Sequence, residues 1–146
     1  MNNIISFSVN FMFLVPLVTY CCNKDIRMLK IFCIGVLLTT SVNPLKHIIV
    51  EHFPNIDFLY RPKEAYDCNF LNEGGKVGGE PGFPSGHMAV SSYIITSLYL
   101  YYNKGLDLGI LYILLVAFAR MNKRCHNIYQ VVGGIIYGYS IAKYFN

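Results

Sequence analysis

The sequence predicts an all-α, polytopic membrane protein: a single domain over residues 1–146 with about five transmembrane helices. Hydrophobic residues make up 54% of the chain and charged residues only 14%, and the mean hydropathy is +0.41. Soluble domains usually carry about 25% charged residues, and a soluble fold of this length cannot bury so much apolar side chain. The same composition excludes a disordered chain and a nucleic-acid-binding tail, and the net charge of +4 names no partner.

Five stretches have the length and apolar character of membrane-crossing helices, which need about 20 largely apolar residues. In chain order, we expect helices over Ile4–Cys22, Met28–Val50, His87–Tyr102, Leu108–Ala119 and Asn127–Tyr144. A soluble bundle is disfavoured, because five buried helices would leave no amphipathic helix to cover them. The N-terminus lacks the basic region and the small-residue cleavage site of a signal peptide, so we expect the first helix to be retained.

Local signals refine these helices. Asn43-Pro44 predicts a kink or an end in the second helix, and Asn103-Lys104-Gly105 predicts a turn after the third. Asp107 is the expected N-cap of the fourth helix, which is short and is expected to borrow flanking residues. Gly134 and Gly138 give the fifth helix a small-xxx-small face that favours close helix packing.

Neither the distribution of basic residues nor the cysteines determine how the chain is oriented in the membrane. The side that carries the 51–86 loop has only slightly more basic residues than the other, too small a bias for the positive-inside rule to settle the orientation. Cys68 and Cys125 fall on that loop's side and would pair if it is oxidising. The adjacent Cys21 and Cys22 are interpreted as small apolar residues, with acylation as the alternative. No cysteine spacing is typical of a metal site.

Polar residues are costly in a membrane protein, so their positions are informative. The sequence places several of them at one predicted membrane face: Lys46 near the end of the second helix, Arg61 in the following loop, Pro84-Ser85-Gly86-His87 at the start of the third helix, and Arg120 and His126 before the fifth. We therefore expect residues far apart in the sequence to form one pocket at the membrane interface.

The residue types in this pocket suit a phosphate group. Ser85 is a natural N-cap, and the free N–H groups at a helix start, such as that of Gly86, attract anions. Arg61 and Arg120 can each grip a phosphate with two donors, and Lys46 adds a compact positive charge. Two histidines, His87 and His126, then supply a nucleophile and a general acid.

This pattern resembles the phosphatidic acid phosphatase type 2 family, the membrane branch of the acid-phosphatase and vanadium-haloperoxidase superfamily. The family motifs are Lys-x6-Arg-Pro, Pro-Ser-Gly-His and Ser-Arg-x5-His-x3-Asp. The second motif is complete at Pro84–His87, and the third appears with Ala119, Arg120, His126 and Gln130. The resemblance covers residues 44–142.

The resemblance implies a phosphatase that forms a phosphohistidine on His126, with His87 as the acid and Gln130 orienting the nucleophile. It also implies a set of phosphate-binding residues: Lys46, Arg61, Ser85, Gly86 and Arg120. It implies no metal and no cofactor. The implied partners are membrane lipids and a lipid phosphate substrate, either a polyprenyl or dolichyl diphosphate or a phosphatidate, with no nucleic acid. The implied location is a multi-pass membrane protein, with the endoplasmic reticulum as one candidate membrane.

Three departures from the family motifs stand out. Ala119 replaces a serine, and Gln130 replaces the aspartate that orients the nucleophile; both features resemble the dolichyl diphosphatase branch, as does the run that begins at Lys46. Fourteen residues separate Lys46 from Arg61, where the family has six. The insert at 52–58 must therefore loop out, and Lys63 is a possible substitute cation.

Two other functions remain open. The chain would be a catalytically inactive membrane scaffold or lipid-binding protein if the stretched first motif and Gln130 mark a lost activity. An intramembrane serine hydrolase with Ser85 as nucleophile and His126 as base is disfavoured, because Phe83 and His87 occupy the glycine positions of a nucleophile elbow. The glycine-rich segment 62–84 is either a cover for the site or a plain surface loop.

Overall fold

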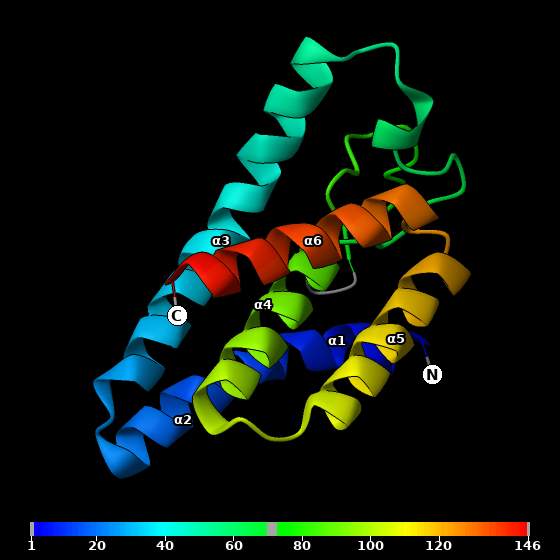
Figure 1. Cartoon of the computed structure of the whole chain (residues 1–146). Coiled ribbons are helices and arrows are strands. Elements are labelled where there is room, and N and C mark those ends of the chain that lie inside the picture. Colours follow the sequence, from blue (N-terminus) through cyan, green and yellow to red (C-terminus); the bar gives the residue numbers. More distant parts are fainter. Residues whose placement is uncertain (1, 70–72, 146) are drawn as a thin grey trace.

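The structure, a computed structural model, describes residues 2–69 and 73–145 (Figure 1). These residues form helices and no strand, as the sequence predicts. The elements in chain order are α1 (Asn2–Met12), α2 (Leu14–Asn23), α3 (Ile26–His52), the short 3-10 helix η1 (Asp57–Leu59), α4 (Gly86–Tyr102), α5 (Leu106–Asn122) and α6 (Ile128–Phe145). Because α1 and α2 together occupy the first predicted segment, the five-helix prediction holds with one helix in two parts.

The first predicted helix is confirmed with one interruption. Phe13 separates α1 from α2 but keeps helical dihedral angles (φ −61°, ψ −30°), and Asn2–Asn23 together form one candidate membrane span. Pro16 lies three residues beyond the division. It has no N–H to donate to the carbonyl of Met12, so the helical hydrogen-bond pattern is interrupted just before it.

The second predicted helix, Met28–Val50, is confirmed and is two residues longer at each end. α3 passes through Pro44 and ends at His52, where Phe53 N donates to Ile49 O at 3.0 Å, so the expected end at Asn43-Pro44 is wrong. A proline removes a single backbone hydrogen bond, and an apolar helix packed against neighbours tolerates that loss. The last two turns of α3, beyond Pro44, carry the chain away from the bundle before it returns (Figure 1).

The remaining helix boundaries follow the sequence closely. α4 begins after Ser85 and ends at Tyr102; its C-cap Asn103 is left-handed with φ 52°, and the predicted turn follows. α5 extends beyond Leu108–Ala119 at both ends, as expected. Its N-cap is Gly105 and not Asp107, which lies inside the first turn, because the left-handed φ of 79° at Gly105 sets the helix start earlier.

α4 is the central helix of the bundle and contacts α1, α3, α5 and α6. Ten of its 17 residues are buried. The predicted small-residue face of α6 is confirmed. A side chain at Gly134 would come within 2.5 Å of Ser85 O, and one at Gly138 would collide with Ala89 O. The two glycines therefore let α6 lie directly against the start of α4, which positions the site.

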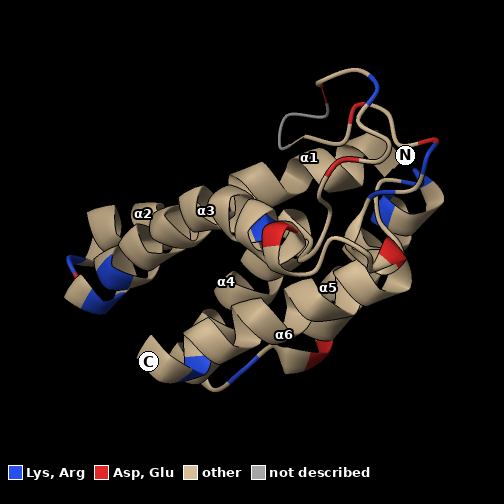
Figure 2. Cartoon of the chain, turned by 90° about the horizontal axis from the view of Figure 1, so that it is seen from above, with Lys and Arg blue, Asp and Glu red and all other residues tan. Residues whose placement is uncertain are grey.

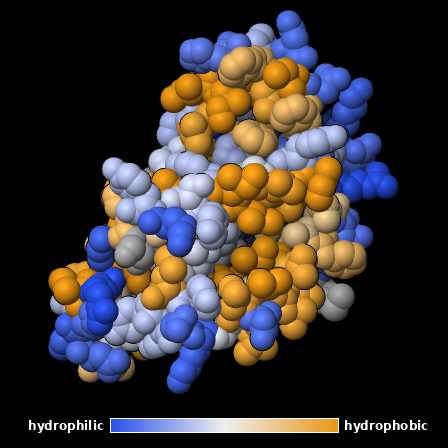
Figure 3. Space-filling view, viewed as in Figure 1, coloured by the Kyte–Doolittle hydropathy of each residue, from blue (hydrophilic) through white to orange (hydrophobic). Residues whose placement is uncertain are grey.

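Much of the outer surface is apolar. Two segments are long and apolar enough to cross a membrane, Asn2–Asn23 with mean hydropathy 1.8 and Ile26–His52 with 1.6, and only 17% and 28% of their most apolar windows are buried. The core helix of a soluble protein would be mostly buried. Charged residues gather at helix ends and loops (Figure 2), and hydrophobic residues gather over α5 and α6 (Figure 3). The surface between the charged ends therefore suits a lipid environment.

Candidate active site

A cavity of about 300 Å³ lies where α3, the 53–85 loop and the start of α4 meet the segment before α6. Five residues singled out in the sequence line it: Lys46, Arg61, Gly86, His87 and His126. The prediction that these residues converge on one pocket is confirmed. The two histidines, 39 residues apart in the sequence, share this one cavity.

The wall on α3 contains residues that the sequence analysis did not select. Thr39, Val42 and Asn43 line the cavity together with Lys46. These four positions follow the i, i+3, i+4, i+7 spacing of one helix face. Projecting a helical face backward from Lys46 would have found them.

The long spacing between Lys46 and Arg61 is absorbed outside the cavity. α3 continues to His52, and the chain then runs back through η1 to Arg61 (Figure 1). The insert therefore loops out, as expected, and both cations reach the same cavity. Lys63 does not replace either of them: it is exposed and lines a separate cavity of about 470 Å³, with Arg61 in the shared wall.

The start of α4 leaves donors available at the site. Ser85 is the N-cap residue, but its side chain makes no capping hydrogen bond, and its buried Oγ has no hydrogen-bond partner among the described residues. Its N–H donates to Gln130 O at 3.0 Å. A Cβ at Gly86 would meet only Val42 at an ordinary 3.5 Å. Since Gly86 lines the cavity, its missing side chain leaves room for a ligand.

The nucleophile candidate His126 is held by a fixed amide. His126 Nδ1 lies 2.8 Å from Gln130 Oε1, and Gln130 Nε2 donates to Phe58 O at 2.9 Å and to Tyr60 O at 2.7 Å. Because those carbonyls can only accept, the amide group must face them with its NH₂, and Oε1 must accept from His126. The Nδ1–H tautomer leaves the lone pair on Nε2, the nitrogen needed for attack.

Positive charge is concentrated in and behind the cavity. Arg61 is buried, and its Nε and Nη1 have no hydrogen-bond partner among the described residues. Arg120, fully buried, donates from Nη2 to Cys68 O at 2.6 Å. Three predicted site residues do not line the cavity but adjoin residues that do. Arg120 bonds to Cys68, Gln130 bonds to His126, and Ser85 precedes Gly86. No three His, Cys, Asp or Glu side chains come together as a metal site within the described ranges.

This surrounding changes the titration of His126. Burial is the largest cause that lowers the pKa of its imidazole well below the ordinary value, and Arg120, Arg61 and Lys46 add to it. The hydrogen bond to Gln130 acts in the opposite direction. Burial also lowers the pKa of Arg61, against the attraction of Glu80. His126 therefore remains neutral, and nucleophilic, at pH values where a free histidine is protonated.

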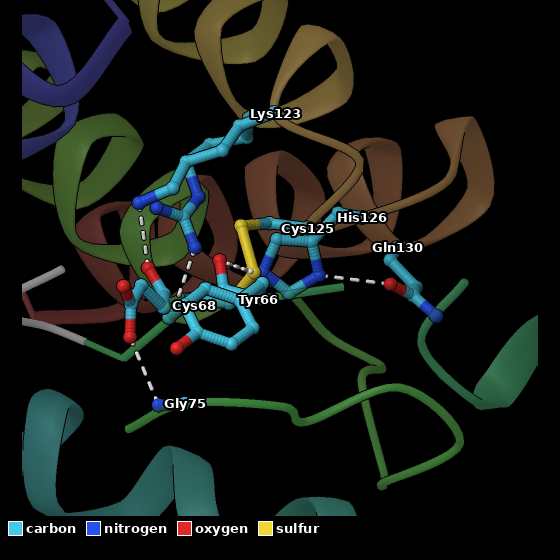
Figure 4. The surroundings of a disulfide bond; sticks show 9 residues. Tyr66, Cys68, Gly75, Lys123, Cys125, His126 and Gln130 are labelled. Atoms are coloured by element: carbon cyan, nitrogen blue, oxygen red, sulfur yellow. Dashed lines mark hydrogen bonds between the residues drawn. A yellow bond between two sulfur atoms is a disulfide. The ribbon is translucent and has the colours of Figure 1, made fainter. Parts of the chain in front are cut away.

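The two cysteines on this side of the fold are joined. Cys68 and Cys125 form a disulfide with Cα atoms 5.4 Å apart, next to His126 and Gln130 (Figure 4). The sequence predicted this pairing only if that side of the membrane is oxidising, and the structure contains the bond. Cys21, Cys22 and Cys33 are free and exposed. The disulfide connects the wall of the cavity to the residue before His126.

The arrangement does not support a serine hydrolase. His126 Nδ1 bonds to Gln130, and Ser85 Oγ bonds to none of the described residues. A nucleophilic serine requires its base within hydrogen-bond reach. The two residues are therefore not arranged as a nucleophile and its base.

Fold and site together define a helical membrane protein with a cationic, histidine-lined cavity. The model of the PAP2 superfamily matches residues 26–146, and the chain belongs to this superfamily. The superfamily has a membrane helical fold and its members are phosphatases, which agrees with the fold and supports a phosphoesterase role. The match gives no support to the dolichyl diphosphatase branch. No curated protein and no solved structure matches the chain.

Proposed function

We propose that this chain is an integral-membrane lipid phosphatase that works through a phosphohistidine on His126, without a metal ion. The observation that carries the proposal is the oriented His126–Gln130 pair at a cationic cavity. Gln130 Oε1 accepts from Nδ1 at 2.8 Å, so Nε2 holds the lone pair. Burial and three nearby cations lower the pKa of His126, so the ring is neutral when the substrate binds.

The cations provide the binding energy for a phosphate group. Lys46 and Arg61 line the cavity, and Arg61 keeps two N–H donors without partners among the described residues. Arg120 adds its charge from behind Cys68. In phosphoryl transfer, the charge of the transition state is spread over the equatorial oxygens, so fixed donors around them lower the barrier. Gly86 N–H at the start of α4 adds a further donor.

The reaction then has two steps. His126 Nε2 attacks phosphorus, the P–N bond forms, and the bond to the leaving oxygen breaks while His87 gives that oxygen its proton. His87, now neutral, takes a proton from a water molecule, which attacks the phosphohistidine and releases inorganic phosphate. Both histidines line the same cavity, which supports this division of roles.

The substrate is a lipid phosphate, either a phosphatidate or an isoprenoid diphosphate. The cavity lies at one end of a bundle whose outer surface is apolar, so a phosphate can enter while its tail stays in the bilayer. We propose that the five helical segments cross the membrane, in an endomembrane such as the endoplasmic reticulum. Gln130 and Ala119 favour a diphosphate.

One assay tests the proposal. Protein purified in detergent, without added metal, is given phosphatidate, lysophosphatidate, an isoprenoid diphosphate and a soluble sugar phosphate, and released phosphate is measured. We expect the lipid substrates to be hydrolysed, His126→Ala to be inactive, and the exposed His47→Ala to match the native protein. Phosphate binding without turnover would instead indicate the inactive lipid-binding scaffold. Normal turnover by His126→Ala would refute the histidine mechanism.

A further inference from the structure

Within the described part of the chain, the disulfide is the only side-chain cross-link between the long loop and the connection from α5 to α6, which contains His126. It spans 57 positions in the sequence. Cys68 belongs to the loop and lines the phosphate cavity, whereas Cys125 directly precedes His126. The bond therefore joins one wall of the cavity to the segment that bears the nucleophile.

The loop residue Cys68 also orients a cation. Arg120 Nη2 donates to Cys68 O at 2.6 Å, and the neighbouring Lys123 Nζ donates to Asp67 O at 2.6 Å (Figure 4). The direction of the Arg120 guanidinium thus depends on the position of a loop carbonyl. A loop that moves away from α5 would leave this buried charge without that acceptor.

The other end of the bond acts on His126. Cys125 N donates to Arg120 O at 3.0 Å, and Arg124 before it has a left-handed φ of 56°. The connection between α5 and α6 is therefore short and tightly turned, and the disulfide fixes its last residue before the nucleophile.

The bond is separate from the packing that holds the helices together. Cys68 and Cys125 form a small buried cluster with Ala65 and Val77 only. The main core, which joins α4 to its neighbours, contains none of these four residues. Opening the disulfide should therefore loosen the loop without unfolding the bundle.

We infer that the Cys68–Cys125 disulfide is a positioning element for the phosphate site: it holds the Cys68 carbonyl that directs Arg120, and so full phosphate affinity requires the oxidised pair. The inference rests on the proposed function. The pair forms by thiol–disulfide exchange with an oxidised disulfide such as glutathione disulfide. One cysteine thiolate displaces a glutathione thiolate, and the second cysteine displaces the other, so two electrons leave the protein. A dithiol such as dithiothreitol reverses this and becomes a cyclic disulfide.

The test uses a background with Cys21→Ser, Cys22→Ser and Cys33→Ser, so that only the buried pair can react. The folded protein in detergent is reduced with dithiothreitol, and thiol alkylation with mass spectrometry reports the fraction of open bond. Binding of inorganic phosphate is measured by calorimetry, and KM and kcat with the substrate from the panel. A double variant, Cys68→Ala with Cys125→Ala, is the reductant-insensitive control.

We expect reduction to weaken phosphate binding and raise KM by about tenfold, the size expected for one lost hydrogen bond to a charged group. kcat should change less, helicity should be unchanged, and glutathione disulfide should restore affinity. The double variant should match the reduced protein with or without dithiothreitol. Unchanged phosphate affinity after confirmed reduction would overturn the inference, as would a loss that occurs only together with helicity, or a pair found unbonded in the oxidised protein. Because phosphate binding is measured without turnover, a chain that binds phosphate but hydrolyses nothing would refute the proposed function alone.

Discussion

The two ends of the helix bundle hold charge in opposite ways. At the turn between α2 and α3, Arg27 and Asp25 form an ion pair of 2.9 Å, with 69% of the Arg27 side chain exposed. Tyr101 Oη also donates to Asp25, at 2.5 Å. At the site end, Lys46 and Arg61 are buried, and neither forms an ion pair within the described ranges.

The difference distinguishes charged residues that stabilise the fold, such as Asp25 and Arg27, from charged residues that bind a ligand, such as Lys46 and Arg61. A buried charge costs free energy unless it is paired, whereas an exposed pair costs and contributes little. At the α2–α3 turn, Asp25 and Arg27 are paired two positions apart in the sequence, and Tyr101 on the facing α4 helix donates to Asp25. At the site end, the compensating negative charge is expected to come from the phosphate of the substrate.

The largest expected effect is a difference in activity between two arginine variants, one at each end of the bundle. Arg61→Met should lower kcat/KM by about 10²–10³-fold, the loss typical of one transition-state donor. Its free energy of unfolding should stay the same or rise, because a buried charge without an ion pair is replaced by an apolar chain. Arg27→Met should leave kcat/KM unchanged. Kinetics and thermal unfolding of both variants measure this; equal losses of activity at the two ends would contradict the comparison.

The next effect concerns the neutral amide at the site end. Gln130→Glu places a carboxylate where Nε2 now donates to Phe58 O and Tyr60 O, at 2.9 and 2.7 Å. A carboxylate cannot donate, so we expect a loss of about 3 kcal/mol in the free energy of unfolding and at least a tenfold fall in kcat/KM.

Gln130→Met is the matched control, because it removes the hydrogen bonds without adding charge. It should be less destabilised than Gln130→Glu in thermal unfolding at neutral pH. A Glu variant as stable as the native protein would show that the loop carbonyls do not select an amide at this position.

The parts of the site that lie close together in the sequence were predictable. Pro84–His87 lie at the start of α4, and only five residues separate Arg120 on α5 from His126, so both patterns can be recognised without knowledge of the fold. The end of α4 and the close face at Gly134 also follow from local rules, since a left-handed turn and a missing side chain are properties of single residues.

The parts that depend on tertiary contacts were not predictable. A hydrogen bond to the Cys68 carbonyl has no signature in the sequence, because every residue carries a carbonyl. The same holds for the two carbonyls that orient Gln130. The disulfide was only conditional, since spacing does not give cysteine pairing. The interruption at Phe13, by contrast, follows from a local signal, because Pro16 cannot donate to the carbonyl of Met12.

A smaller effect separates two lysines on the site side. The pKa of His126 is lowered by burial first and then by Arg120, Arg61 and Lys46. Removing a positive neighbour favours the imidazolium, so Lys46→Met should raise that pKa. The acid limb of the kcat/KM profile should then move to higher pH. Lys63→Met, which removes an exposed lysine outside the cavity, should not move it.

Comparing the two lysine variants also cancels the contribution that titration of the substrate phosphate makes to the pH profile. The phosphate of the substrate titrates equally in both variants, so only the difference between their acid limbs reports His126. An identical shift in both would mean that general surface charge, and not the buried Lys46, controls the nucleophile.

The smallest effect is expected at the α2–α3 turn. Asp25→Asn keeps the N-cap acceptor that receives Arg27 N at 2.9 Å but removes the negative charge. Hydrogen bonds from Arg27 lower the pKa of Asp25 well below its ordinary value, so its stabilising effect is complete above the ordinary carboxyl pKa and is lost as pH falls through the lowered value. We therefore expect a small drop in melting temperature at neutral pH that shrinks in acid and at high salt, with kcat/KM unchanged. A change in kcat/KM, or a stability difference that grows in acid, would mean that this end of the bundle is coupled to the site and that the division between structural and ligand-binding charge does not hold.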